Sequence, residues 1–135
     1  MTDQQTLFGY RIDEAEETLA DAKALLESGR SPRSVVNRSY YAMFYAVLAL
    51  LIAEDIEHKT SKHSGIIAIF DKAIIHAGRL DRDYSRMLHR MFDTRQECDY
   101  KEFVQVSPDD AAIAVEQAER FLAGIKGLLA EKVGE

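Results

Sequence analysis

The sequence predicts an all-α protein, an up-and-down bundle of about five helices. Two observations support this prediction. Several stretches place apolar residues at spacings of three and four, and no stretch of useful length alternates apolar and polar residues as a strand would. The chain has 135 residues, of which 47% are hydrophobic and 30% charged, so it fits one globular domain over residues 1–135.

The first two helices differ in how their apolar residues are arranged. The first is apolar on one face and ends at the segment ESGRSP; the face consists of Ile12, Ala15, Leu19, Ala22 and Leu26. The second, from about Arg33 to Glu54, is apolar nearly all round, and we therefore expect it at the centre of the fold. One side of it is a lane of small residues that permits close approach of a neighbouring helix or of a second subunit: Ala42, Ala46, Ala49 and Ala53.

Three further helices follow in the second half of the chain. The third begins near His63 and ends near Gly78, and the fourth runs from about Leu80 to Asp99. The segment SPDD at residues 107–110 then supplies a serine N-cap, a proline at the first helical position and an acid three residues after the cap. It predicts the start of a fifth helix, whose apolar face is formed by Ala111, Val115, Ala118, Leu122, Ile125 and Leu129.

Composition argues against several classes of protein. The longest uncharged run, Ser39 to Ala53, is short for a membrane span, and the N-terminal segment lacks the basic-then-apolar order of a signal peptide. We therefore expect a cytoplasmic protein without membrane contact. The single cysteine, Cys98, cannot form an intrachain disulfide, and no Cys/His cluster has zinc spacing. The sequence has no glycine-rich phosphate loop, GxSxG or HExxH, and we expect neither a metal nor a cofactor.

Charge is distributed unevenly along a chain whose net charge is −6. Residues 11–27 hold six acids and two bases, whereas residues 72–95 hold six Lys or Arg and two histidines. Any anion site is therefore expected in the middle of the chain. A basic ridge on the fourth helix could meet a nucleic-acid backbone, nucleotide phosphates or an acidic partner, or could be a solvated helix face: Arg79, Arg82, Arg86 and Arg90.

Arg95 lies on the apolar stripe of the fourth helix, seven residues after Leu88 and four after Met91. A buried arginine must be paired or must line a cleft, because an unpaired buried charge is costly. One interpretation is a structural ion pair, with Asp99 at i+4 or with an acid of the first helix. The other is a guanidinium held at a cleft, where its planar fork binds phosphate.

Polar groups also open the second and third helices. His63 lies on the apolar face of the third helix, either as a half-buried structural histidine or, beside Lys62 and a helix N-terminus, as part of an anion site. In the second helix Asn37, Arg38 and Tyr41 lead into the apolar run. At least one of the two adjacent tyrosines that end in Tyr41 is expected to pack in the core with its hydroxyl bonded.

Three segments, SYYAMFYAVLALL, KTSKHSGIIAIF and RQECDY, occur in this order and together resemble the HEPN domain family of small prokaryotic helical proteins. The resemblance covers about residues 8–130, which would be the core of the domain. It implies a bundle of about five helices that is frequently a homodimer. It also implies a minimal nucleotidyltransferase as partner, commonly in a toxin–antitoxin pair.

Many toxin-like members of that family cleave RNA without metal, through an Arg followed four to six residues later by a His. The His acts as general acid or base and the Arg stabilises phosphate charge. This chain departs from the pattern, because no histidine follows Arg95. Tyr100 stands near that slot, and a tyrosine with an ordinary pKa of about 10 is a poor base at neutral pH. Arg82 and His89 have six residues between them and share a helix face, but they lie upstream of the family position.

The primary hypothesis is a homodimeric binding module that partners a minimal nucleotidyltransferase and binds a nucleotide or RNA phosphate at a polar cleft. The candidate cleft residues are Arg95, Asp99, Tyr100, His63, Asn37, Arg38, Tyr41 and Lys62. One alternative is a metal-independent ribonuclease toxin that uses Arg82 with His89, or Arg95 with Tyr100. Another is a structural interaction protein whose polar cluster only fixes the helix register.

Overall fold

The computed structural model describes residues 2–100 and 105–134, and these ranges contain helices and no strand. The elements are α1 (Asp3–Glu27), α2 (Pro32–Ala53), α3 (His63–Phe70), a short π-helix η1 (Asp71–Ile75), α4 (Arg82–Tyr100) and α5 (Pro108–Gly134). The prediction of an all-α fold with about five helices is confirmed.

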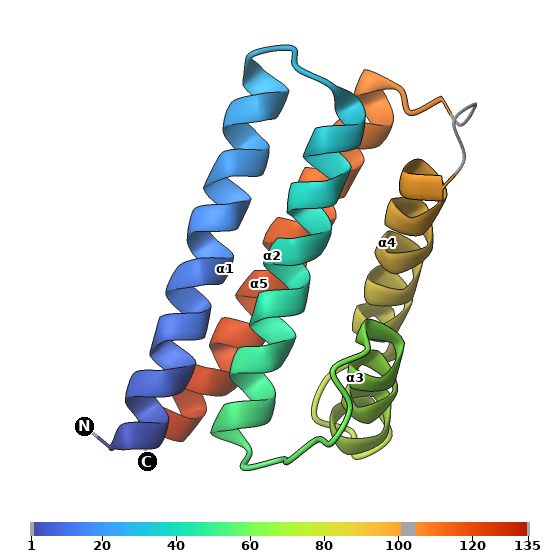
Figure 1. Cartoon of the computed structure of the whole chain (residues 1–135). Coiled ribbons are helices and arrows are strands. Elements are labelled where there is room, and N and C mark those ends of the chain that lie inside the picture. Colours follow the sequence, from blue (N-terminus) through green and yellow to red (C-terminus); the bar gives the residue numbers. More distant parts are fainter. Residues whose placement is uncertain (1, 101–104, 135) are drawn as a thin grey trace.

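The helices form a bundle around α2 (Figure 1). The chain runs up α1, down α2, up α4 and down α5, with α3 and η1 packed beside the lower end of α4. Helix α2 packs most extensively against α1 and also contacts α3, α4 and α5, which confirms its predicted central place. The alanine lane is buried, from Ala42 at 0% exposed to Ala53 at 1%. The lane therefore serves packing within the chain rather than contact with a second subunit.

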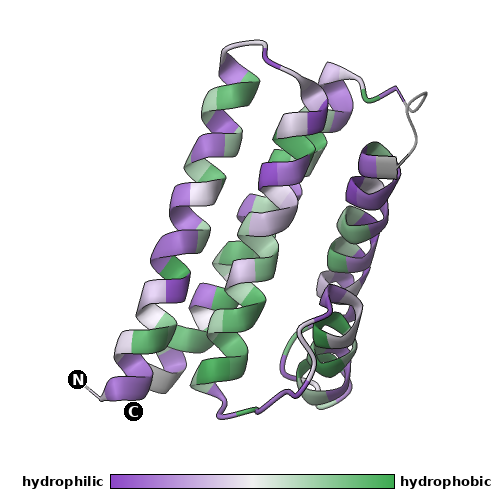
Figure 2. Ribbon diagram, viewed as in Figure 1, coloured by the Kyte–Doolittle hydropathy of each residue, from purple (hydrophilic) through white to green (hydrophobic). Residues whose placement is uncertain are grey.

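Hydrophobic residues are concentrated on the lower half of α2 and where the helices face one another (Figure 2). Helix α2 is long and apolar enough to cross a membrane by length and composition, yet 67% of its apolar window is buried inside the bundle. A core helix of a soluble protein passes the same test. Its largest buried side chains include Tyr40, Met43, Leu50 and Leu51.

Local capping sets several helix ends. The predicted capping box of α5 is present, because Ser107 Oγ accepts from the Asp110 N–H at 3.0 Å and Asp110 Oδ2 accepts from the Ser107 N–H at 3.1 Å. The third predicted helix is α3 continued by η1, and the turn after it holds Gly78 at φ 76°. Helix α4 begins at Arg82, slightly later than expected, since Asp81 Oδ1 accepts the N–H of Asp83.

Candidate functional site

The site is built around Tyr40, which is fully buried on α2. Its hydroxyl lies 2.8 Å from Nδ1 of His63, the first residue of α3. The imidazole of His63 also stacks on the ring of Phe44, one turn after Tyr40, with the ring centroids 4.0 Å apart. These contacts hold the N-terminus of α3 against α2.

Burial controls the protonation of both groups. It raises the pKa of Tyr40 well above its ordinary value, so this hydroxyl stays protonated. Burial, followed by the charge of Arg95, lowers the pKa of His63 below its ordinary value. The imidazole is therefore neutral at neutral pH, and one of its nitrogens is engaged with the Tyr40 hydroxyl as donor or acceptor according to the tautomer.

Arg95 reaches the same aromatic surface from α4. Its guanidinium carbon lies 4.9 Å from the ring centroid of Tyr40 and 5.7 Å from that of Tyr41, within the range of cation–π interactions. The side chain is 15% exposed, and its Nη1 donates to Asp99 Oδ2 at 3.0 Å. The predicted pairing with Asp99 is thus present. The Nε of Arg95 is buried and has no hydrogen-bond partner among the described residues.

A second guanidinium lies against Tyr41. The guanidinium carbon of Arg38 is 5.2 Å from the Tyr41 ring centroid, and its Nε and Nη2 donate to Asn37 Oδ1 at 3.1 and 2.8 Å. The acceptor on this arginine is a neutral amide, whereas the acceptor on Arg95 is the Asp99 carboxylate. Two positively charged guanidinium groups therefore lie against the ring of Tyr41, and one carboxylate, that of Asp99, contacts one of them among the described residues.

We call this group the arginine–tyrosine cluster; it consists of Asn37, Arg38, Tyr40, Tyr41, Phe44, His63, Phe92, Arg95 and Asp99. The structure brings together six of the eight predicted cleft residues. Lys62 is exposed at the N-cap of α3, where its backbone N–H donates to Thr60 Oγ1. The side chain of Tyr100 lies outside the described residues.

Three members of the cluster are additions to the predicted set. Tyr40 and Phe44 come from one face of α2, and Phe92 places its ring 5.9 Å from the Arg95 guanidinium carbon. Their i, i+4 and i, i+3 spacings were visible in the sequence. What the sequence left open was which of the two adjacent tyrosines faces inward. A further anchor is Arg33, whose Nη1 donates to the backbone oxygen of Cys98 at 2.6 Å and ties the end of α4 to α2.

The basic ridge is partly neutralised. Arg79 pairs with Glu54 at 2.9 Å, and Arg86 pairs with Asp83 at 2.9 Å, while Arg82 is exposed. The other residue proposed for ribonuclease chemistry, His89, is half exposed and has its Nε2 2.5 Å from Asp71 Oδ2. Ser85 Oγ donates to the other oxygen of Asp71 at 2.7 Å.

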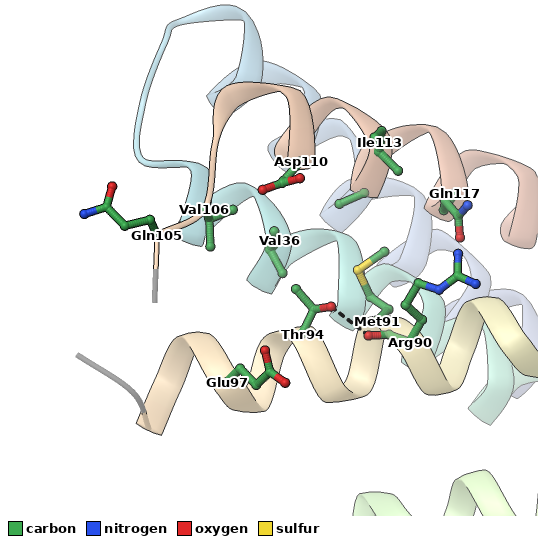
Figure 3. Close-up of a pocket in the computed structure, with 11 residues that line it drawn as sticks. Val36, Arg90, Met91, Thr94, Glu97, Gln105, Val106, Asp110, Ile113 and Gln117 are labelled. Carbon is green, nitrogen blue, oxygen red and sulfur yellow. Dashed lines mark hydrogen bonds between the residues drawn. The ribbon is translucent and has the colours of Figure 1, made fainter. Parts of the chain in front are cut away.

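The fourth arginine of the ridge, Arg90, belongs to a different region that the sequence did not predict. A groove of about 300 Å³ lies between α2, α4 and α5 (Figure 3). We call it the α4–α5 groove; it is lined by Val36, Arg90, Met91, Thr94, Glu97, Gln105, Val106, Asp110, Ile113, Ala114 and Gln117. In the part of the chain that the structure describes, no group of three or more His, Cys, Asp or Glu side chains is placed to hold a metal ion.

Comparison with known proteins identifies the relatives of this chain. The HEPN domain family matches residues 9–130. A UPF0332 protein of Thermotoga maritima is 36% identical over 129 residues, which are 96% of either chain. Two proteins of Methanocaldococcus jannaschii, each named "Putative toxin", are 32% identical over 89% of this chain and 87% of theirs, and 31% identical over 90% and 80%.

Proposed function

The chain belongs to the HEPN domain family, and we propose that it is a cytoplasmic, phosphate-binding component of a toxin–antitoxin module. Its partner in this proposal is a minimal nucleotidyltransferase, its working state is a homodimer, and its ligand is a phosphate of a nucleotide or of RNA. The names of the two Methanocaldococcus relatives support the toxin–antitoxin setting. A partly exposed apolar stripe on α2, which begins at Tyr41 of the cluster, supports contact with a second copy: Tyr41, Tyr45, Leu48 and Ile52.

The observation that carries the proposal is the pair of guanidinium groups on Tyr41. Two like charges against one ring repel each other, and Asp99 offsets only one of them. A phosphate oxygen is a stronger acceptor than the Asn37 amide that Arg38 now contacts. Arg95 donates one of its five N–H groups to Asp99, so other donors of this guanidinium are left for an anion.

The cluster is also rigid before any ligand arrives. Three aromatic rings lie within 6 Å of the Arg95 guanidinium carbon, and the Tyr40–His63 hydrogen bond fixes one of those rings. A guanidinium that is already held in place loses little conformational freedom on binding. In the proposed bound state, phosphate oxygens accept from Arg95 and Arg38, and Asp99 moves away from the incoming anion.

The test is equilibrium binding of a fluorescein-labelled single-stranded RNA and of ATP to the purified chain. Arg95→Met and Arg38→Met keep the apolar stem and remove the charge. We expect each to raise Kd by about tenfold or more, and each lost RNA phosphate contact to reduce the slope of log Kd against log salt by about 0.7. Arg30→Met is the matched control, an exposed arginine between α1 and α2 outside both the cluster and the basic ridge, and should bind as the unaltered chain does.

Unchanged binding in both Arg38→Met and Arg95→Met, with helicity retained in circular dichroism, would refute the cluster as the phosphate site. A partner test is independent of that result. Co-expression with a minimal nucleotidyltransferase should give a stoichiometric complex in size-exclusion chromatography, and separate elution of the two proteins would remove the partner from the proposal.

One observation favours a second candidate function, a metal-independent ribonuclease. The contact of His89 with Asp71 resembles the way a carboxylate orients a catalytic imidazole, and the exposed Arg82 lies two turns away on the same helix. RNA cleavage in EDTA, with expression toxicity measured in parallel, tests it. Cleavage that is lost in His89→Ala but kept in a variant of another exposed histidine, His76→Ala, supports the enzyme; absence of cleavage and toxicity eliminates it.

A further inference from the structure

We propose that the α4–α5 groove is a docking site for a helical segment of a partner protein, which presents apolar side chains between one acidic and one basic residue. The groove lies on the face of α4 that carries Arg90 and Thr94 (Figure 3), and Arg95 is not among the residues that line it. The proposal does not depend on phosphate binding at the arginine–tyrosine cluster, because the two regions share no residue.

The groove exists because α4 and α5 pack tightly at one end and less tightly at the other. The two helices run in opposite directions (Figure 1). Near the start of α4, the ring of Tyr84 closes directly on Gly124, where an added Cβ would lie within 2.6 Å of three ring and hydroxyl atoms. Toward its other end, Thr94 of α4 lines the groove together with Ile113 and Ala114 of α5.

The apolar part of the groove has a buried floor and an exposed edge. Val36, Met91 and Ala114 are between 1% and 6% exposed and form the floor. Ile113, at the edge, is 54% exposed and is one of three large hydrophobic side chains exposed in the described ranges. An apolar edge beside a preformed hollow is typical of a protein interaction site, because burying it against a partner removes that surface from water.

The charges at the groove specify what the partner must carry. The guanidinium of Arg90 projects beside Gln117 (Figure 3), and neither it nor the carboxylate of Glu97 makes a hydrogen bond or ion pair to a described side chain. Seven residues of helix separate them by about 10 Å along the axis. Asp110, by contrast, already caps α5 through the Ser107 N–H.

This spacing matches a segment of two helical turns. On the partner helix, an acid facing Arg90 and a base facing Glu97 would be seven residues apart. The apolar residues would lie between them, three or four positions from the acid. The rim residues, among them Arg90, Glu97 and Ile113, are exposed, so the groove is open to solvent. Its volume is at the small end for sites that enclose a small molecule but suffices for apolar side chains inserted from a partner.

The probe for this test is a phage-displayed library of helical peptides with randomised surface positions, selected on the full-length chain. We expect an apolar pair flanked by Asp or Glu on one side and Lys or Arg on the other, seven residues apart. Against the selected peptide, Ile113→Asp and Arg90→Glu should each raise Kd at least about tenfold in fluorescence polarisation. Reversing the peptide's acid to lysine should restore binding to Arg90→Glu only.

Two neighbouring substitutions are the controls. Ala112→Asp adds the same charge to an exposed position of α5 outside the groove, and Arg82→Glu reverses an exposed arginine of α4 outside the groove. Both should leave the peptide Kd unchanged. Selected peptides that bind all four variants equally, or a library that yields no binder, would overturn the proposal. So would sedimentation showing a dimer that only Ile113→Asp dissociates, because the occupant would then be a second copy.

Discussion

The two faces of α4 hold arginines five residues apart that have opposite environments. Arg95 is 15% exposed, lies against three aromatic rings and pairs with Asp99, whereas Arg90 is exposed beside a groove and has no paired carboxylate among the described residues. The neighbouring helices make the difference, because α2 presents two tyrosines and α5 presents Ala114 and Ile113. A fixed guanidinium suits a small anion of defined geometry, and a free one can adapt to a protein surface.

The largest effect on stability is expected in the arginine–tyrosine cluster, from removal of the Tyr40 side chain. This ring is fully buried and contacts Arg95, His63 and Phe44. We expect Tyr40→Ala to lower the free energy of unfolding by about 3–5 kcal/mol, the range for deletion of a buried aromatic side chain. Urea denaturation followed by circular dichroism measures it. Tyr10→Ala, at a position 71% exposed, is the control and should change it by less than about 0.5 kcal/mol.

The next largest effect is expected where α4 and α5 close. Gly124→Ala would place its Cβ 2.4 Å from Cε1 of Tyr84, so the ring or the helix must shift, at a cost of about 1–3 kcal/mol. Gly127→Ala is the control on the same helix, since a Cβ added there would have no atom within 4 Å beyond the adjoining backbone of α5, and it should stabilise by up to about 1 kcal/mol. If both variants unfold at the same urea concentration, α4 and α5 do not close tightly at Tyr84, and the groove must have another origin.

The sequence predicted what depends on local spacing. The contact of Arg95 with Asp99 and the capping box at Ser107 join residues three or four positions apart, and one helix fixes such distances. The central place of α2 followed from its all-round apolar character. These features need no knowledge of how the helices are arranged in space.

The rest depends on tertiary packing. The Tyr40–His63 bond joins residues 23 positions apart, and Arg79 pairs with Glu54, the residue after α2, so spacing within one helix could not reveal either contact. The groove was missed for the same reason. It depends on where Tyr84 meets Gly124, which is a contact between helices rather than a pattern within one.

A smaller effect, a loss of folding stability at low pH, is expected from His63 on the side of the cluster. Folding lowers the pKa of His63 below its unfolded value of about 6.5, so the unfolded state binds more protons as pH falls through that value. This contribution to stability is present above about pH 6.5 and is lost toward the folded pKa. The groups that face the ring are Tyr40, Tyr41 and Phe44 from α2, and the charge of Arg95 from α4.

Urea midpoints at pH 7.5 and 5.5 measure this effect. The unaltered chain should lose more stability over the interval than His63→Gln, in which the titrating group is absent. His58→Gln, at an exposed position in the loop before α3, is the control for the replacement of a histidine by glutamine. An equal loss in the unaltered chain and His63→Gln would mean that the imidazole is as free to ionise in the fold as outside it.

The smallest effect on stability is expected at the groove. Ile113 is 54% exposed, so Ile113→Ala removes little buried surface and should change the free energy of unfolding by less than about 0.5 kcal/mol. The large apolar side chain of Ile113, exposed beside the groove, is then available to a partner without a contribution to folding. If Ile113→Ala instead destabilised the chain as strongly as a core substitution, Ile113 would belong to the packing between α4 and α5. The face of α4 that carries Arg90 would then contribute to folding, as the face that carries Arg95 does.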